Sequence, residues 1–381
     1  MLVAAVVLAM QALPWPPSAE AAEFRSKARR AFLMDANSGE VFYEKNADKL
    51  MPPASMSKIM TMLVVFDLLK KGKISEDDEF EITAEIWKRG GAPSGGSTMY
   101  AKPGERIRLR DLIRAVIVVS ANDAAMAIAE GIAGSEEAFA RMMNEYARKI
   151  GLVKSTFVNS TGLPHPQHRV TARELALMGQ HLIKTFPEYY KIYSIREFEW
   201  NGIKQHNRNP LLGRYPGADG IKTGYTREAG YGLVASAVRD GRRLIAVIAG
   251  LKSKRERAQE ARKILDFGFR QFRPVALYKA GDEVTEARVW GGAEDFVPLV
   301  VAEDITVRLT DSERKRASLK AVFTAPLRAP VKAEQKVGEL RVFVGKKMVA
   351  RWPLYTGRAV AEDRAMFGRA MDTVKSWIFG G

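Results

Sequence analysis

The chain of 381 residues contains no cysteine. A disulfide framework, a reactive thiol and a cysteine-based zinc site are therefore all excluded. Histidine is scarce as well, since the only four are His165, His168, His181 and His206. Pro166 stands between the first two, and a proline there prevents the regular helix on which two-histidine zinc motifs depend. We therefore expect neither a metal site nor a cofactor.

Acidic residues are few relative to basic ones. Lys and Arg number 60 against 44 Asp and Glu, which gives a formal net charge of +16. Basic proteins often bind nucleic acid, but no zinc module, recognition helix or aromatic–basic RNA motif accompanies this charge. We predict no nucleic-acid partner and expect attraction to anionic lipid or cell-wall polymer instead. The densest basic group comprises Arg239, Arg242, Arg243, Lys252, Lys254, Arg255 and Arg257.

Long apolar runs are also missing. The apolar stretch Leu2–Leu13 is too short to span a bilayer, and it is followed by prolines and by Ala19-Glu20-Ala21. An apolar core before an A-x-A site is typical of a secretory signal, so residues 1–21 are predicted to be a cleaved signal peptide and the protein to be exported. No Lys or Arg precedes the apolar core, which departs from the usual signal pattern.

Three short motifs stand out in what is present. The first is Ser55-Met56-Ser57-Lys58, which follows two prolines and opens an apolar run at helical spacing. Residues three apart share a helix face, so Lys58 is expected within hydrogen-bonding reach of Ser55. A second S-x-x-K, at Ser312–Lys315, sits in a charged run without an apolar face and is predicted to be a solvated turn. Ser55 is therefore the candidate nucleophile, and a buried, neutral Lys58 is its candidate base.

The second motif, Ser120-Ala121-Asn122, lies between the apolar runs Leu112–Val119 and Ala124–Ile132. Its hydroxyl could relay a proton and its amide could hold a carbonyl, although both residue types are also ordinary helix caps. The third motif, Lys222-Thr223-Gly224, precedes two β-rich runs around an Asp-Gly turn, which predicts a strand of an antiparallel sheet. Its cation and hydroxyl suit a carboxylate, and its glycine permits close backbone approach.

Further along, composition indicates a second domain and a tail. Residues 275–356 alternate short apolar strands with Gly, Pro and charged turns, which predicts a small all-β domain after a catalytic domain at 24–272. Residues 361–381 place Met, Phe, Val, Trp and Ile at helical spacing opposite charged side chains. This pattern favours an amphipathic helix in a membrane interface, with a helix packed on its own domain or a dimer contact as alternatives.

Taken in this order, the three motifs resemble those of the low-molecular-mass penicillin-binding proteins, the D-alanyl-D-alanine carboxypeptidases. The resemblance covers nearly the whole chain, and its other matching stretches are Met34–Gly39, Lys102–Gly104, Ser120–Ala124, Val170–Glu174 and Gly202–Leu212. It implies an α+β fold: a serine β-lactamase/penicillin-binding-protein-like catalytic domain, with an antiparallel sheet and a helical subdomain, followed by the all-β domain.

The resemblance also implies roles for single residues. Ser55 would be acylated with Lys58 as its base, and Ser120 and Asn122 would serve proton transfer and substrate binding. Lys222, Thr223 and Gly224 would hold the terminal carboxylate of the peptide, and the backbone N–H groups of Ser55 and Tyr225 would form the oxyanion hole. The family also carries an arginine shortly before the last helix of the catalytic domain. Counting back from Asp266–Phe269 places it at Arg257, whereas counting forward from the preceding strand places it at Arg255.

The implied partners are peptidoglycan stem peptides, β-lactam antibiotics and, through the C-terminal helix, an anionic membrane surface. The implied location is the outer face of the cytoplasmic membrane, in the periplasm or its equivalent. Three alternatives stay open at this point. They are a D,D-endopeptidase with the same chemistry, a class A-type β-lactamase, and a wall-binding or penicillin-sequestering module without strong activity.

Overall fold

The computed structural model describes residues 2–8, 24–271, 273–309, 311–314 and 316–363. The chain divides into two compact units, Phe24–Phe269 and a second unit that combines Arg270–Gly381 with Met1–Glu23. We call these the catalytic unit and the β unit, after the two domains expected from the sequence. Among the described residues, none of the helices has the length and apolar character needed to cross a membrane.

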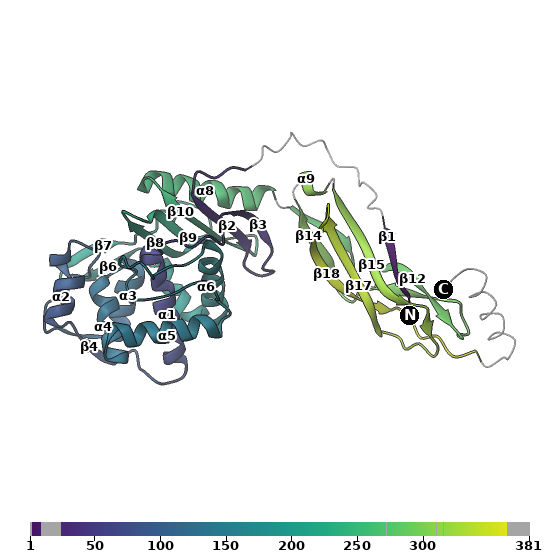
Figure 1. The fold of residues 1–381 in the computed structure, drawn as a ribbon, viewed down its shortest axis with the longest axis horizontal. Helices are drawn as coiled ribbons and strands as arrows, with labels where there is room; N and C mark the ends of the chain where they lie inside the picture. The colour runs from purple at the N-terminus through teal and green to yellow at the C-terminus, as the bar shows by residue number, and fades with distance from the viewer. Residues whose placement is uncertain (1, 9–23, 272, 310, 315, 364–381) are drawn as a thin grey trace. The chain divides into compact units, whose positions relative to one another are not determined.

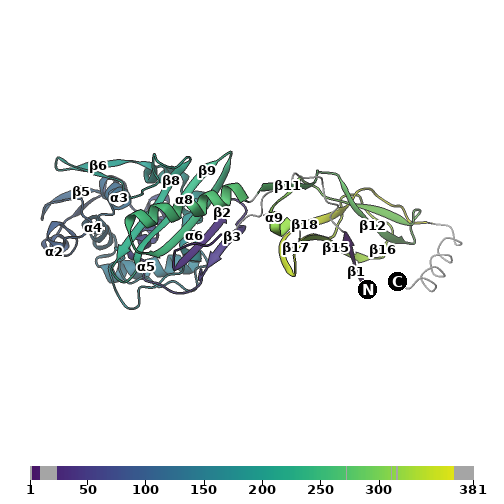
Figure 2. The same ribbon diagram turned by 90° about the horizontal axis from the view of Figure 1, so that it is seen from above.

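The catalytic unit is built on a five-stranded antiparallel sheet with the strand order β3-β2-β10-β9-β8 (Figures 1 and 2). Its strands are β2 (Arg30–Asp35), β3 (Val41–Lys45), β8 (Ala218–Thr226), β9 (Gly230–Arg239) and β10 (Arg242–Leu251). The β9–β10 turn has Asp240 and Gly241 in the left-handed region, as the Asp-Gly signal predicts. Because β8 is an edge strand, the third motif lies at the margin of the sheet.

Helix α8 (Lys254–Gln271) covers one face of this sheet, and α6 (Ala172–Thr185) packs against β2 and β10. In α8, Gly268 leaves no room for a side chain, because a Cβ there would lie 2.6 Å from Leu244 and 2.9 Å from Leu33. The helix can therefore approach β10 and β2 closely. Figure 2 shows α8 stretched across the strands.

The remaining helices form a subdomain around α1 (Lys58–Lys70). The residues from Lys58 to Phe66 are all buried, so α1 is a central helix enclosed by its neighbours rather than an amphipathic surface helix. Those neighbours are α3 (Leu109–Val118), α5 (Glu136–Lys149) and α6, and α4 (Asn122–Ala133) packs in turn against α3 and α5. The smaller helices are η1 (Ala54–Ser57), α2 (Ala84–Gly90), η2 (Ala92–Ser94), α7 (Pro187–Tyr190) and η3 (Lys191–Ser194). Two small antiparallel sheets complete the unit, β4 (Glu79–Glu81) with β5 (Arg106–Arg108) and β6 (Glu197–Trp200) with β7 (Ile203–His206).

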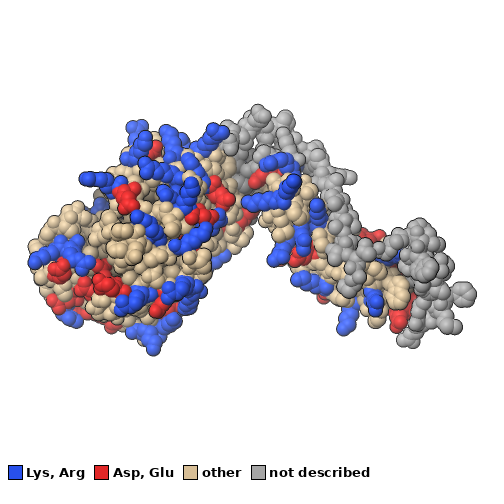
Figure 3. Space-filling model, in the orientation of Figure 1, with Lys and Arg blue, Asp and Glu red and all other residues tan. Residues whose placement is uncertain are grey.

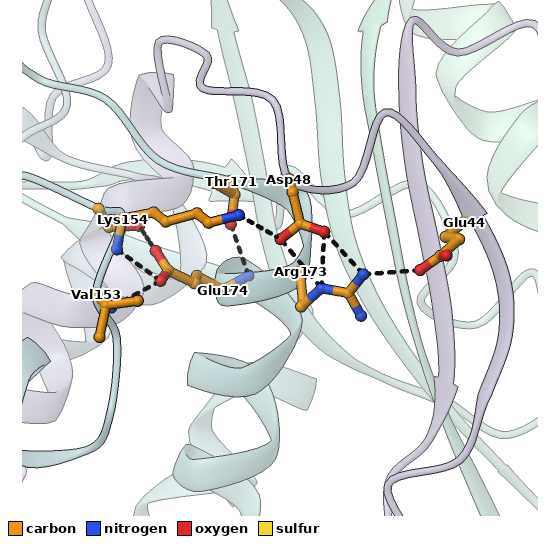
Figure 4. Close-up of polar contacts among 8 residues, drawn as sticks. Glu44, Asp48, Val153, Lys154, Thr171, Arg173 and Glu174 are labelled. Atoms are coloured by element: carbon orange, nitrogen blue, oxygen red, sulfur yellow. Dashed lines mark hydrogen bonds and ion pairs between the residues drawn. The ribbon is translucent and has the colours of Figure 1, made fainter. Parts of the chain in front are cut away.

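A polar network ties α6 to the loops beside it (Figure 4). Arg173 donates to both carboxylate oxygens of Asp48 and to Glu44, at distances down to 2.7 Å. Glu174 accepts hydrogen bonds from the backbone N–H groups of Val153 and Lys154, each at 2.9 Å. The Val170–Glu174 stretch noted in the sequence therefore anchors the start of α6 and lies apart from the three motifs.

The β unit contains a seven-stranded sheet with the order β1-β15-β17-β18-β13-β12-β16. Its elements are β1 (Leu2–Leu8), β11 (Arg273–Tyr278), β12 (Glu283–Trp290), β13 (Phe296–Val300), β14 (Ile305–Leu309), α9 (Asp311–Arg314), β15 (Ala317–Ala325), β16 (Leu327–Arg328), β17 (Lys336–Val344) and β18 (Lys347–Thr356). Strands β11 and β14 form a separate pair, and a distinct apolar core fills the unit. The second S-x-x-K falls at α9, between two strands, while Lys315 lies outside the described residues.

Two predicted segments lie wholly or partly outside the described part of the chain. Within the segment predicted as a signal peptide, Leu2–Leu8 form β1, which pairs antiparallel with β15, whereas residues 9–21 are not described. The signal peptide therefore stays a prediction. The same holds for the C-terminal helix, because residues 364–381 are outside the described range.

Candidate active site

The three motifs meet at one cleft of about 530 Å³ in the catalytic unit. Ser55 in η1, Ser120 and Asn122 at the α3–α4 corner, and Thr223, Gly224 and Tyr225 on β8 all line it. Lys58 and Lys222 are buried at its base, with exposed fractions of 1% and 3%. The sequence motifs thus come from a central helix, a helix junction and a sheet edge, as predicted.

Lys58 lies one turn along the helix from Ser55. Its Nζ atom is 3.2 Å from Ser55 Oγ, 2.7 Å from Asn122 Oδ1 and 2.6 Å from the carbonyl oxygen of Thr161. Asn122 and Thr161 can accept two N–H donors of a neutral amine, which leaves the nitrogen lone pair available toward Ser55. Burial lowers the pKa of Lys58 to about 7, and the carboxylates of Glu136 and Asp123 oppose this shift. The geometry and the charge state therefore both suit a base.

Ser120 occupies the corner between α3 and α4 with a φ of 65°, in the left-handed region that non-glycine residues rarely adopt. This backbone angle costs roughly 1 kcal/mol or more, and such strain is concentrated at functional sites. The Ser120 hydroxyl accepts a 2.8 Å hydrogen bond from Lys222 Nζ. Among the described hydrogen bonds, its lysine partner is therefore Lys222 rather than Lys58.

Lys222 is the second cation of the cleft. Burial is the main cause that lowers the pKa of Lys222 well below its usual value, and repulsion from Lys58, Arg208 and Arg257 adds to it. Burial is therefore the largest cause for both lysines, and repulsion between them adds to the lowered pKa of Lys222. On the same strand, a Cβ at Gly224 would lie 3.0 Å from the Met56 side chain and 3.1 Å from Pro53 O. The glycine lets β8 pass directly beside the nucleophile segment.

Of the two candidate arginines, only Arg257 lines the cleft. It is 7% exposed, and its guanidinium lies 5.7 Å from the ring centre of Tyr231, which itself stacks on Tyr225. Burial lowers the pKa of Arg257 to about 10, so the side chain remains charged at neutral pH. Arg255 is exposed and does not line the cleft.

Sequence reasoning missed several residues of the cleft. The Thr161 carbonyl that contacts Lys58 belongs to a loop whose residue types carry no chemical signal. Arg208 and Lys254 add two more cations to the wall. Arg208 falls within Gly202–Leu212, one of the stretches that resemble the family, and that match could have identified it as a candidate site residue. Gly95 and Gly96, from a glycine-rich loop at residues 90–96, form part of the rim.

None of the four histidines is among the described residues that line the cleft. His168 is 1% exposed with both ring nitrogens unpartnered, and burial lowers its pKa to about 4. His206 is exposed on β7. Within the described ranges, no group of three or more His, Asp or Glu side chains is arranged to hold a metal ion.

Similar proteins identify the family of this chain. Residues 17–253 match the family described as D-alanyl-D-alanine carboxypeptidase, and residues 272–362 match the C-terminal domain of penicillin-binding protein 5. D-alanyl-D-alanine carboxypeptidase DacC of Escherichia coli is 41% identical over 350 residues, covering 91% of this chain and 87% of that protein. DacF of Bacillus subtilis is 34% identical over 380 residues, covering 96% and 95%.

Solved structures give the same answer. Penicillin-binding protein 5 from Haemophilus influenzae superposes with a TM-score of 0.73 at 36% identity, covering 90% of this chain and all of that one. The ampicillin-bound penicillin-binding protein D2 from Listeria monocytogenes matches with a TM-score of 0.59 at 32% identity, covering 65% of this chain and 99% of that one. The chain therefore belongs to the D-alanyl-D-alanine carboxypeptidase family of serine hydrolases.

Proposed function

We propose that this protein removes the terminal D-alanine from peptidoglycan stem peptides through an acyl-Ser55 intermediate. The observation that carries the proposal is the buried amine of Lys58, 3.2 Å from Ser55 Oγ, with a pKa lowered to about 7. At neutral pH an appreciable fraction of this amine is unprotonated and can accept the serine proton.

In the first half-reaction, Ser55 Oγ attacks the carbonyl carbon between the two terminal D-alanines, and its proton passes to Lys58. The backbone N–H groups of Ser55 and Tyr225 would stabilise the oxyanion that develops. The C–N bond then breaks. The leaving amine takes up a proton through Ser120, D-alanine departs, and the shortened peptide remains as an ester on Ser55.

In the second half-reaction, a water molecule attacks the ester carbonyl and gives up a proton to the same basic groups. The Ser55–acyl bond breaks, Ser55 regains its proton, and the peptide leaves with a new terminal carboxylate. Asn122 supports both steps in two ways. Its Oδ1 holds Lys58, and its Nδ2 faces Gly96 at the rim, where a substrate carbonyl would lie.

Lys222, Thr223 and Arg257 would bind the terminal carboxylate that distinguishes a carboxypeptidase substrate from an internal peptide. Arg257 and Thr223 line the cleft, and Lys222 lies beneath them on β8. No acidic side chain is among the described residues that line it, so the site is complementary to an anion. A penicillin carries a comparable carboxylate beside its reactive amide and would acylate Ser55 in the same way.

The decisive experiment compares wild type, Ser55→Ala and Ser312→Ala with a stem peptide ending in D-Ala-D-Ala and with a labelled penicillin. We expect Ser55→Ala to form no adduct and to lose D-alanine release by at least about 10³-fold. The matched control Ser312→Ala, which removes the serine of the other S-x-x-K, should behave as wild type. If wild type binds penicillin but releases no D-alanine, the protein is a sequestering module and the proposal fails.

We further propose that the protein acts outside the cytoplasmic membrane, attached peripherally through residues 361–381. Two features support this: the net charge of +16, which favours anionic surfaces, and the amphipathic sequence pattern of the tail. In Figure 3, Lys and Arg are scattered over the visible face of the catalytic unit with Asp and Glu between them, rather than gathered in one patch. Deletion of 361–381 should abolish sedimentation with phosphatidylglycerol vesicles, and unchanged sedimentation would refute the anchor.

A further inference from the structure

One carboxylate near the cleft has no part in the chemistry described above. Glu136 is the first residue of α5, where an acidic side chain commonly sits at the surface and faces the helix dipole. Here it is instead 6% exposed. Burial of a carboxylate is costly unless its oxygens are satisfied, so its partners show what it holds.

Glu136 joins two segments. Its Oε2 accepts a 2.6 Å hydrogen bond from Arg89, and its Oε1 accepts from Ser160 Oγ at 2.7 Å and from the Ser160 N–H at 3.3 Å. The Arg89 side chain is 46% exposed, so solvent screens its positive charge. The Ser160 bonds are buried, and the next residue, Thr161, lines the cleft.

The Ser160–Thr161 segment is the link between Glu136 and the base. The Ser160 carbonyl accepts a 2.7 Å hydrogen bond from Thr61 on α1, and the Thr161 carbonyl accepts a 2.6 Å bond from Lys58. This short piece of loop is thus held by Glu136 on one side and by two residues of α1 on the other. Any shift of Ser160 would also move the Thr161 carbonyl, which accepts the hydrogen bond from the Lys58 amine.

We propose that Glu136 is a positioning residue of the acylation reaction, which holds the Thr161 carbonyl on the Lys58 amine through its hydrogen bonds to Ser160. The inference rests on the proposed function. The polar and charged groups that face Lys58 are Ser55, Asn122 and the Thr161 carbonyl in contact, with Lys222, Asp123 and His168 further out. Of the two carboxylates that favour protonated Lys58, Glu136 contributes more.

The sign of the effect follows. A negative charge stabilises the ammonium form of Lys58, so its removal should lower the pKa of the amine further. Acylation requires the neutral amine, and its rate rises as pH increases through that pKa. Glu136→Gln should therefore move the acidic limb of the pH–rate profile to lower pH by roughly 0.5–1 unit. The rate on the plateau should also fall about tenfold, because Gln places an amide against Arg89 and loosens Ser160.

The test measures the second-order rate of acylation by a labelled penicillin from pH 5 to 9. The matched control is Glu137→Gln, at the next residue, whose side chain is exposed. It should leave both the acidic limb of the pH–rate profile and the plateau rate unchanged. Ser160→Ala keeps the charge but removes the hydroxyl bond, so it should lower the plateau without moving the limb. Glu136→Asp keeps the charge and should return the limb to its wild-type position.

The two proposals fail in different ways. If wild type itself is not acylated, the proposed function fails. If wild type is acylated and a folded Glu136→Gln, checked by circular dichroism, keeps the wild-type limb, the inference is overturned. Should Glu136→Gln not fold, Ser160→Ala decides, since a wild-type plateau in that variant would show that the Glu136–Ser160 contact does not position the base.

Discussion

Lys222 on β8 donates a 2.8 Å hydrogen bond to the Ser120 hydroxyl at the α3–α4 corner, and thereby joins the sheet to the helical subdomain across the cleft. Within the helical subdomain, Lys58 of α1 donates to Oδ1 of Asn122, the other polar residue of this corner. Each lysine thus holds one residue of the same S-x-N corner. Burial lowers the pKa of both lysines. Ser120 and Asn122 therefore lie between two amines that can release a proton more readily than an exposed lysine.

The first prediction concerns pH. Since burial lowers the pKa of Lys58 to about 7 and the neutral amine is the active form, penicillin acylation should accelerate as pH rises through about 7 and then level off. Stopped-flow measurement of the acylation rate against pH tests this. Lys58→Arg should reduce acylation by at least about 10³-fold, because a guanidinium does not deprotonate in this range. A flat profile between pH 5.5 and 8.5 would contradict the assignment of Lys58 as base.

The second prediction separates the two arginines. Arg257→Ala should raise KM for a D-Ala-D-Ala peptide about 10- to 100-fold, because a charge-assisted contact with the terminal carboxylate is lost. Arg255→Ala serves as the control, since its exposed side chain lies outside the cleft wall. Steady-state kinetics of both variants provides the measurement. Equal effects of the two substitutions would remove Arg257 from the carboxylate site.

The third prediction concerns the approach of β8 to the nucleophile. In Gly224→Ala the added Cβ would press on Met56 and Pro53 at 3.0–3.1 Å and push the strand away from Ser55. We expect acylation to slow about tenfold with little change in thermal stability. The control is Gly72→Ala in the turn after α1, which does not line the cleft and where a Cβ meets nothing within 4 Å. Because Gly72 has a left-handed φ of 63°, this variant should lose some thermal stability through backbone strain but keep the wild-type acylation rate. If Gly224→Ala is acylated at the wild-type rate, the close approach of β8 to the Ser55 segment is not required for acylation.

The fourth prediction concerns stability. His168 is buried and neutral, with a folded-state pKa of about 4 against about 6.5 when unfolded. Well above pH 6.5 the residue is unprotonated in both states, so its titration contributes nothing to the free energy of unfolding. As pH falls from 6.5 toward 4, the unfolded chain gains a proton that the folded chain excludes, so the free energy of unfolding decreases.

At pH 4.5 this effect should amount to about 2–3 kcal/mol. His168→Phe should remove it, since both ring nitrogens are unpartnered and the ring packs against Phe157. Urea unfolding at pH 7 and pH 4.5 measures the difference. His206→Phe, at an exposed position, should keep the wild-type loss. If His168→Phe loses as much stability on acidification as wild type, the acid sensitivity lies elsewhere.

Much of the site follows from local sequence. Prolines followed by an apolar run determine that Ser55 stands at the start of a buried helix, and a three-residue spacing determines that Lys58 lies over it. The β-rich runs around Asp240-Gly241 determine a hairpin, which places Lys222 on the strand before it. These features depend on residues close in the chain, so periodicity and turn chemistry are sufficient to predict them.

Tertiary structure alone decided the rest. The pairing of Lys222 with Ser120, the choice of Arg257 over Arg255 for the cleft wall, and the Glu136–Ser160–Thr161 link to Lys58 join segments far apart in the chain. No local pattern encodes such contacts, because they arise when the sheet and the helical subdomain bury their apolar faces against each other. The lowered pKa of Lys58 has the same origin, since burial in the folded chain produces it and the sequence only supplies the lysine.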